Sequence, residues 1–387
     1  MAAGVYLAVS PTALFASRQL DGAVVAAVGG MVSLGGWLRF LDEEVNGRLW
    51  LNLSIGGLAL ALSSSSLIYS LMLSLGLAAL CLAWVWPNAS GERRLWSLLR
   101  PHLRYAVVAL VLTGLALSTG LGWHMVGLGA MGDLLAAWVS RFSPALQSAA
   151  SPVAILVIYE LFAVLFGVGG LVLAVLRRWR FGVLLGLWAG LESLMPGRLP
   201  LDTLGIVLPL AMLAGSAVEL LVQRLVKRGT WRFEGLCGLV VVTLWVHSYL
   251  MLARYAAYGY SANLIVALTA VVLQILLMLV FAFAMQFEVV FRGVVVGTAL
   301  VSLAATLSAG WGVAYVRPAD PRELLVHRPT DVGVRELVQT LRELSWRETG
   351  IPTTLPVTFE ADPYSALAWY MRCLLYTSDA ADELDGV

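Results

Sequence analysis

Charged residues are scarce in this 387-residue chain. They make up 13% of it, and the formal net charge is only +1, whereas a soluble domain of average composition carries roughly 25% charged residues. Without an excess of positive charge the chain has no electrostatic field suited to nucleic acid, so no nucleic-acid partner is expected. So few polar groups could not cover the surface of a domain in water, which excludes an ordinary soluble fold.

Several familiar motifs are also missing. The three cysteines have no paired spacing, which argues against a disulfide framework or a zinc site. No Walker loop, HExxH or GxSxG occurs in the sequence, and this weighs against nucleotide-driven transport and the familiar hydrolases. The acidic trio at 42–44 lies between Arg39 and Arg48 and is interpreted as a solvated loop, so no metal site is predicted.

Apolar residues dominate instead. They form 60% of the chain, and the mean hydropathy is +0.85. They fall in runs of about the length that crosses roughly 30 Å of hydrocarbon, at 3–17, 22–41, 49–64, 68–87, 105–122, 151–176, 181–197, 203–223, 235–254, 263–287 and 293–315. The pattern predicts an all-α polytopic membrane domain over residues 1–316, with about eleven transmembrane helices.

Orientation follows from the basic residues between these runs. They form clusters separated by two spans each, so all can lie on one side of the membrane: Arg93, Arg94, Arg100 and Arg104; Arg177, Arg178 and Arg180; Arg224, Lys227, Arg228 and Arg232; and Arg292. The positive-inside rule makes that side the cytoplasm. We therefore expect a multi-pass plasma-membrane protein whose tail after Tyr315 is external.

Two external segments are long enough to fold. An interfacial helix is predicted at about 132–145, with its apolar face on the outer leaflet. Residues 317–372 are charge-rich and predict an amphipathic helix followed by a strand at 353–359, the opening of a small α/β domain. Residues 373–387 begin with CLLYTSDAADE, which resembles the translation of a transposon-end adapter used in sequencing libraries. An adapter artefact is favoured over a natural acidic tail, and we expect the natural protein to extend past Arg372 and before Met1.

Ionisable groups inside hydrocarbon cost about 2.5–3.5 kcal/mol on insertion scales, so each is a functional candidate. Glu160 and Glu192 lie inside predicted spans. Glu219 and Glu288 lie near basic loops, where an ordinary interfacial salt bridge is the simpler interpretation.

On the predicted outer face, the candidate site residues are Arg18, Asp21, Asp133, Glu192, Arg198 and Asp202. Arginine forks hold phosphate oxygens, and a carboxylate can act as a general base towards a hydroxyl. Such a set suits a substrate with a phosphate and a polyhydroxylated part. Helix caps and lipid headgroup contacts are the alternative explanation for each residue.

Three stretches of the chain resemble one known family. They are Ser10-Pro11 with Ser17-Arg18 and Asp21; Gly132-Asp133 with Trp138, Pro152 and Tyr159-Glu160; and Ala189-Gly190 with Glu192, Met195-Pro196, Leu208-Pro209-Leu210 and Leu213-Ala214-Gly215. The tail adds Tyr315-Val316, the run 318–326, Asp331-Val332 and 369–372. Together they resemble membrane glycosyltransferases of the GT-C superfamily, and most closely the flippase activity-associated proteins of archaeal-type N-glycosylation. The resemblance covers nearly all of residues 1–372.

The resemblance implies an enzyme that transfers a sugar from a polyprenyl-phosphate donor at the outer membrane face, without a nucleotide. An acidic residue early in the chain would deprotonate the acceptor or organise a divalent cation, the one cofactor that the family leaves open. Nothing upstream of Ser10 matches that acid, so Glu192 and Asp133 stand as catalytic candidates and the chain as given is expected to be inactive.

Substrate contacts are expected from Arg18, Asp21, Glu160 and Arg198. Two alternatives remain open. A lipid-linked sugar flippase or transporter would use Glu160 and Glu192 as a polar pathway, although transporters usually carry repeated halves and none is evident. The other is a non-catalytic subunit of a glycosylation complex.

Overall fold

The computed structural model describes residues 2–19, 21–42, 46–87, 98, 100–123, 125, 127–142, 152–196, 199–228, 231–284, 286–326, 333–355, 357, 367, 370 and 371. Within these ranges the chain is helical and contains no β-strand. In chain order the helices are α1 (Ala2–Val9), α2 (Pro11–Ser17), α3 (Ala23–Asp42), α4 (Gly47–Ser64), α5 (Leu67–Val85), α7 (Leu103–Ser118), α8 (Gly127–Ser140), α9 (Pro152–Tyr159), α10 (Leu161–Leu176), α11 (Arg180–Ser193), η1 (Pro200–Thr203), α12 (Leu204–Arg228), α13 (Trp231–Tyr258), α14 (Ser261–Ala284), α15 (Phe287–Trp311), η2 (Gly312–Val316) and α16 (Gly333–Thr349).

Six of the described helical segments are long and apolar enough to cross a membrane, and a seventh span results if the bent pair α9–α10 is counted as one. The chain therefore has the all-α architecture of a multi-pass membrane protein. The prediction of about eleven spans is not confirmed, because several predicted spans are shorter or less apolar. For example, α7 has 16 residues and α11 has 14, which at 1.5 Å per residue reach only about 24 and 21 Å.

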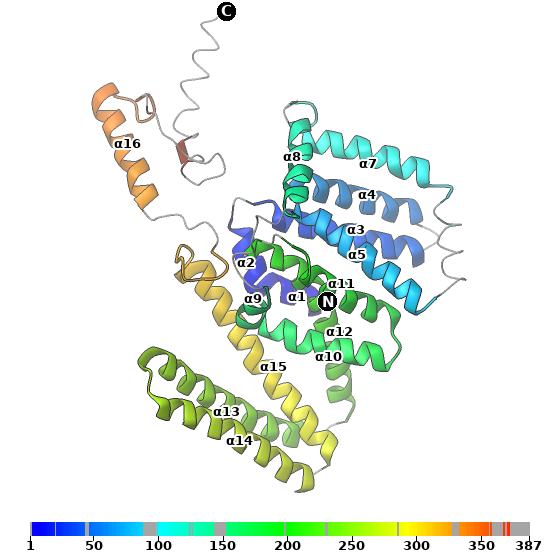
Figure 1. The fold of residues 1–387 in the computed structure, drawn as a ribbon, viewed down its shortest axis with the longest axis vertical. Coiled ribbons are helices and arrows are strands. Elements are labelled where there is room, and N and C mark those ends of the chain that lie inside the picture. The colour runs from blue at the N-terminus through cyan, green and yellow to red at the C-terminus, as the bar shows by residue number, and fades with distance from the viewer. Residues whose placement is uncertain are drawn as a thin grey trace, which may run out of the picture.

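The helices form neighbouring groups (Figure 1). Helices α3, α4, α5 and α7 lie side by side, and α1, α10, α11 and α12 occupy the centre. Helix α13 packs against α15, and α14 packs mainly against α13. Helix ends that the basic residues assign to the same side of the membrane contact each other in the structure. At one end the Arg180 guanidinium donates to the Trp86 carbonyl at 3.2 Å, and we call this the arginine end. The opposite end carries Ser65, Ser66 and η1, and we call it the serine end.

Glycine lets neighbouring helices approach until their backbones touch. A Cβ on Gly57 of α4 would lie 2.6 Å from the Gly29 carbonyl oxygen of α3, and one on Gly36 would lie 2.8 Å from the Ser54 amide nitrogen. Both distances are shorter than real Cβ contacts. Apolar burial gives little net attraction between helices surrounded by lipid, so this close packing of small residues is a main source of helix association.

The tail is partly as predicted. Helix α16 is amphipathic, and its buried Val338 packs with Met371. The predicted strand at 353–359 is wrong for the residues that the structure describes there, which form turns and irregular backbone. The Ser345 hydroxyl accepts from the amides of Thr354 and Leu355, both at 3.1 Å. These two backbone amides therefore bond to a side chain and not to the carbonyls of a neighbouring strand. Residues 373–387 lie outside the described residues.

Adjacent glycines of α4 provide a test of this packing. Gly57→Ala should destabilise the protein by about 1–3 kcal/mol, since the new methyl group is forced against the α3 backbone. Gly56→Ala should stabilise it by about 0.5–1 kcal/mol, because nothing lies within 4 Å of its Cβ position and alanine favours a helix. Thermal unfolding in detergent micelles measures both, and equal effects would contradict the α3–α4 geometry.

Candidate functional site

A ladder of three buried serines runs along α5. Ser66, Ser70 and Ser74 are four residues apart and therefore lie on one face of the helix. Each hydroxyl binds a side chain of a different partner. Arg141 donates to Ser66 at 2.8 Å, the Trp138 indole donates to Ser70 at 2.9 Å, and Ser74 donates to Glu192 at 2.5 Å. The ladder forms a polar seam through an otherwise apolar group of helices.

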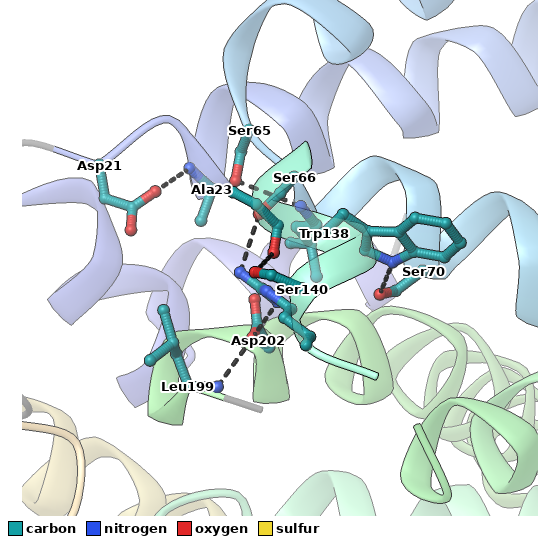
Figure 2. A network of polar contacts seen from close by, with 12 residues as sticks. Asp21, Ala23, Ser65, Ser66, Ser70, Trp138, Ser140, Leu199 and Asp202 are labelled. Atoms are coloured by element: carbon teal, nitrogen blue, oxygen red, sulfur yellow. Dashed lines mark hydrogen bonds and ion pairs between the residues drawn. The ribbon is translucent and has the colours of Figure 1, made fainter. Parts of the chain in front are cut away.

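The outer rung lies at the serine end (Figure 2). The Arg141 guanidinium, just after α8, pairs with the Asp202 carboxylate of η1 at 2.6 Å. Asp202 also accepts from the Leu199 amide at 2.8 Å, which caps η1. The two side chains are only 14% and 8% exposed. A largely buried pair with further hydrogen bonds is held in one geometry, so α8 is fastened across the end of α5.

Aromatic packing holds the middle rung. The Trp138 ring contacts Tyr69 of α5 with centroids 5.9 Å apart, and Phe142 packs edge-on against it at 5.0 Å. Figure 2 shows the Trp138 indole reaching Ser70. Trp138 thus supplies both apolar contact and the donor that Ser70 needs in hydrocarbon. A helix is present near the predicted interfacial one, as α8, and it begins before the predicted residue 132 and ends before the predicted residue 145.

The inner rung ends at Glu192, which is 1% exposed near the end of α11. Its Oε2 accepts from Ser74, and its Oε1 would lie 3.2 Å from a Cβ on Gly205. Glycine at 205 therefore leaves room for the carboxylate beside the start of α12. A carboxylate at this depth is costly unless it is hydrogen-bonded, and the serine meets part of that need.

A cavity of about 380 Å³ shares α5 and α11 with the ladder, although none of the ladder's own residues lines it. It is bounded by α3, α4, α5, α7, α11 and α12, and its walls are almost entirely apolar. Trp188 lines it, and the buried indole Nε1 of that residue has no hydrogen-bond partner. Met72 of α5 and Val107 of α7 also line the cavity and are about half exposed, so it opens laterally towards the bilayer. Trp188 and Glu192 are one helical turn apart, which places the apolar cavity next to the polar seam.

Glu160 occupies a different position, at the break between α9 and α10, where the two helices bend by 103°. Its carboxylate is 0% exposed. It accepts from the Tyr6 hydroxyl, from Ser10 Oγ at 2.5 Å and from the Thr12 amide at 2.9 Å. The break after α1 therefore meets the break before α10. These bonds give Glu160, predicted to bind substrate, a role in joining four short helices.

Arg18, predicted to contact substrate, lies against the chain just after α15. Its guanidinium donates to the Ala314 carbonyl at 2.6 Å and lies 4.4 Å from the centroid of the Tyr315 ring. Nearby, Glu323 accepts from the Tyr159 hydroxyl and pairs with Arg317 at 2.8 Å. The tail segment around Glu323 is thus bonded to Tyr159, the residue preceding Glu160.

The remaining predicted residues do not converge on one centre. Asp21 accepts from the Ala23 amide at 2.9 Å and caps α3 (Figure 2). Asp133 is exposed on α8, and Arg198 lies outside the described residues. The described residues contain no group of three or more potential metal ligands. Glu192 and Asp202 are linked through the ladder, whereas Glu160 and Arg18 belong to the junction with the tail.

Sequence reasoning missed Arg141 and the serine ladder. A serine at every fourth position of an apolar helix was the available signal, together with an arginine at the end of an interfacial helix.

Comparisons with known proteins returned no match, whether with protein-family models, curated proteins or solved structures. The site has to be interpreted from its own geometry.

The Arg141–Asp202 pair can be tested by a double-mutant cycle. Arg141→Ala should cost about 3–5 kcal/mol, because it leaves a buried carboxylate unpaired. Adding Asp202→Asn should recover part of that loss, since no unpaired charge remains. Arg317→Ala serves as control. The Arg317 side chain is 55% exposed, so its ion pair with Glu323 should contribute only about 0–1 kcal/mol to stability. Additive effects of the two site variants in unfolding experiments would show that the pair is not coupled.

Proposed function

We propose that this chain is a glycosyltransferase-like membrane protein that binds a polyprenyl-phosphate-linked sugar at the outer membrane face. The observation that carries the proposal is that α5 and α11 carry the serine ladder and its carboxylate on one side and line a separate apolar cavity with other residues. A polyprenyl-phosphate sugar has the same division, with a branched hydrocarbon chain joined to an anionic, polyhydroxylated head. The resemblance to GT-C enzymes supports the same substrate class.

The cavity suits the hydrocarbon part of such a substrate. Its walls are built from leucine, isoleucine and methionine side chains of several helices, and methionine adapts to irregular apolar shapes. The Trp188 indole N–H faces an acceptor-poor lining, so a ligand oxygen would satisfy the one buried donor left open there.

The seam suits the head group. Arg141 provides a guanidinium at the serine end, and bidentate contacts of this group with phosphate are strong. Ser66, Ser70 and Glu192 are buried and bonded to one another's neighbours in this structure, so sugar hydroxyls would bind along the seam by exchanging with these present partners. Glu192 remains the buried carboxylate proposed to act on an acceptor hydroxyl, and a divalent cation remains a proposal of the family resemblance.

A lipid-linked sugar flippase or transporter is the second candidate, and the two meeting helix breaks favour it. Discontinuous helices at mid-membrane are a common way for transporters to build binding sites. The enzyme and the transporter differ in the outcome for the sugar, since one forms a new glycosidic bond and the other moves the intact lipid.

Photocrosslinking tests the substrate class. A polyprenyl phosphate carrying a diazirine on its chain should label the protein in nanodiscs. Met72→Trp should reduce labelling several-fold by filling the mouth of the cavity, whereas Leu73→Trp, an exposed neighbour that does not line it, should not. Equal labelling of both variants would refute the cavity as the lipid site.

Sugar transfer in proteoliposomes tests the activity, and it uses the longer natural protein that the sequence analysis expects, because the chain as given is expected to be inactive. With a radiolabelled polyprenyl-phosphate sugar and an acceptor, Glu192→Gln should lower transfer by roughly 10²-fold or more if the carboxylate acts as general base, while labelling by the diazirine lipid is retained. Ser302→Ala is the control, because that buried hydroxyl bonds only to its own helix. Labelling without transfer, combined with movement of the intact lipid between leaflets, would favour the flippase instead.

A further inference from the structure

A second cavity lies between α10 and α12 at the arginine end, away from the serine ladder. Its volume is about 340 Å³. Two stripes of residues line it, each at the spacing that places side chains on one helix face. The stripe on α10 runs from Gly170 to Arg177, and the stripe on α12 runs from Ser216 through Glu219 to Gln223.

Helix packing explains why the cavity opens there. A Cβ on Gly170 would lie 2.4 Å from the Leu213 carbonyl oxygen, so the two backbones touch at this level. Arg177 is seven residues beyond Gly170, and Glu219 is six residues beyond Leu213. At 1.5 Å per residue these positions lie about 10 and about 9 Å further along their helices. The two opposite charges therefore stand at nearly the same depth on the two walls.

These charges do not pair with each other. Among the described residues no ion pair of Arg177 is present, and Glu219 accepts only from the Gln223 side-chain amide, at 3.5 Å. Both side chains are exposed. A cavity that carries a cation and an anion on opposite walls, with space between them, is complementary to a ligand that carries both charges.

The chain turn after α10 fixes one wall of the cavity. The Trp179 amide donates to the Ala174 carbonyl at 2.8 Å and the Arg178 amide to that of Val175 at 3.1 Å, which is the Schellman arrangement. The residue that takes the left-handed backbone conformation in this motif is usually glycine, but here it is Arg178, with φ 54°. The Trp179 ring packs near Ala174, so an aromatic side chain suited to the membrane interface borders the cavity.

We propose that this cavity binds the headgroup of a zwitterionic phospholipid with a primary ammonium, of the phosphatidylethanolamine type. The Arg177 guanidinium binds the phosphate, the Glu219 carboxylate accepts from the ammonium, and the acyl chains follow the apolar side chains of Leu173 and Leu220. Phosphatidylglycerol has the phosphate without the ammonium. Phosphatidylcholine has a quaternary ammonium that cannot donate a hydrogen bond. The proposed site therefore discriminates among three common lipids, and it is independent of the glycosyltransferase proposal.

Native mass spectrometry tests the site. The whole chain is mixed in micelles with each of the three synthetic lipids in turn, and the lipid that stays bound after release from the micelle is measured. Wild-type protein should retain phosphatidylethanolamine roughly tenfold more tightly than either other lipid, about 1.4 kcal/mol. Glu219→Gln should abolish the preference over phosphatidylglycerol, because only the ammonium contact is lost. Arg177→Gln should weaken binding of both phosphatidylethanolamine and phosphatidylglycerol.

Arg104→Gln is the matched control, since Arg104 is an exposed arginine on α7 that does not line the cavity; it should leave the lipid preference unchanged. Thermal unfolding of each variant establishes that it is folded before lipid is added. Equal retention of the three lipids by the wild type overturns the proposal, and so does a preference that survives both Arg177→Gln and Glu219→Gln.

Discussion

A carboxylate surrounded by helix ends holds the centre of this protein together. Inside hydrocarbon there is no water to satisfy a polar group, so every break in a helix needs a donor or acceptor from the protein. Among the described residues, the break at Ser10 and the break at Glu160 supply each other's partners. Because Tyr6 also binds this carboxylate, four short helices that could not cross a membrane singly become one unit.

The same constraint explains the serine ladder. A hydroxyl in an apolar helix usually bonds back to its own backbone, as Ser302 does. Ser66 instead accepts from Arg141, just after α8, and Ser70 accepts from Trp138 of α8. Ser74 bonds back to α5 and also donates to Glu192 of α11. The ladder therefore joins α8 to a buried carboxylate, on helices whose other faces line the apolar cavity. This combination of a polar seam with a lipid-facing cavity is the physical basis for assigning a lipid-linked polar substrate.

Much of the architecture could be predicted from local sequence. Apolar runs located most of the long helices, and the scarcity of charge marked Glu160 and Glu192 as unusual. The predicted salt bridge of Glu288 is present, with Arg292 at 2.9 Å. What could not be predicted is which distant residue meets which. Arg141 and Asp202 are 61 positions apart, and no periodicity relates them. The strand expected at 353–359 failed for a related reason, because the Ser345 hydroxyl competes for its backbone amides.

The separation in sequence between Glu160 and its partners also sets an order of assembly. Ser10 and Thr12 emerge from the ribosome about 150 residues before the carboxylate that they bind. Until the α9–α10 pair enters the bilayer, the first two helices carry a hydroxyl and an amide without their final partner. The pair α1–α2 therefore reaches its native position only after α3, α4, α5 and α7 have been made, so a segment synthesised before those helices is completed after them.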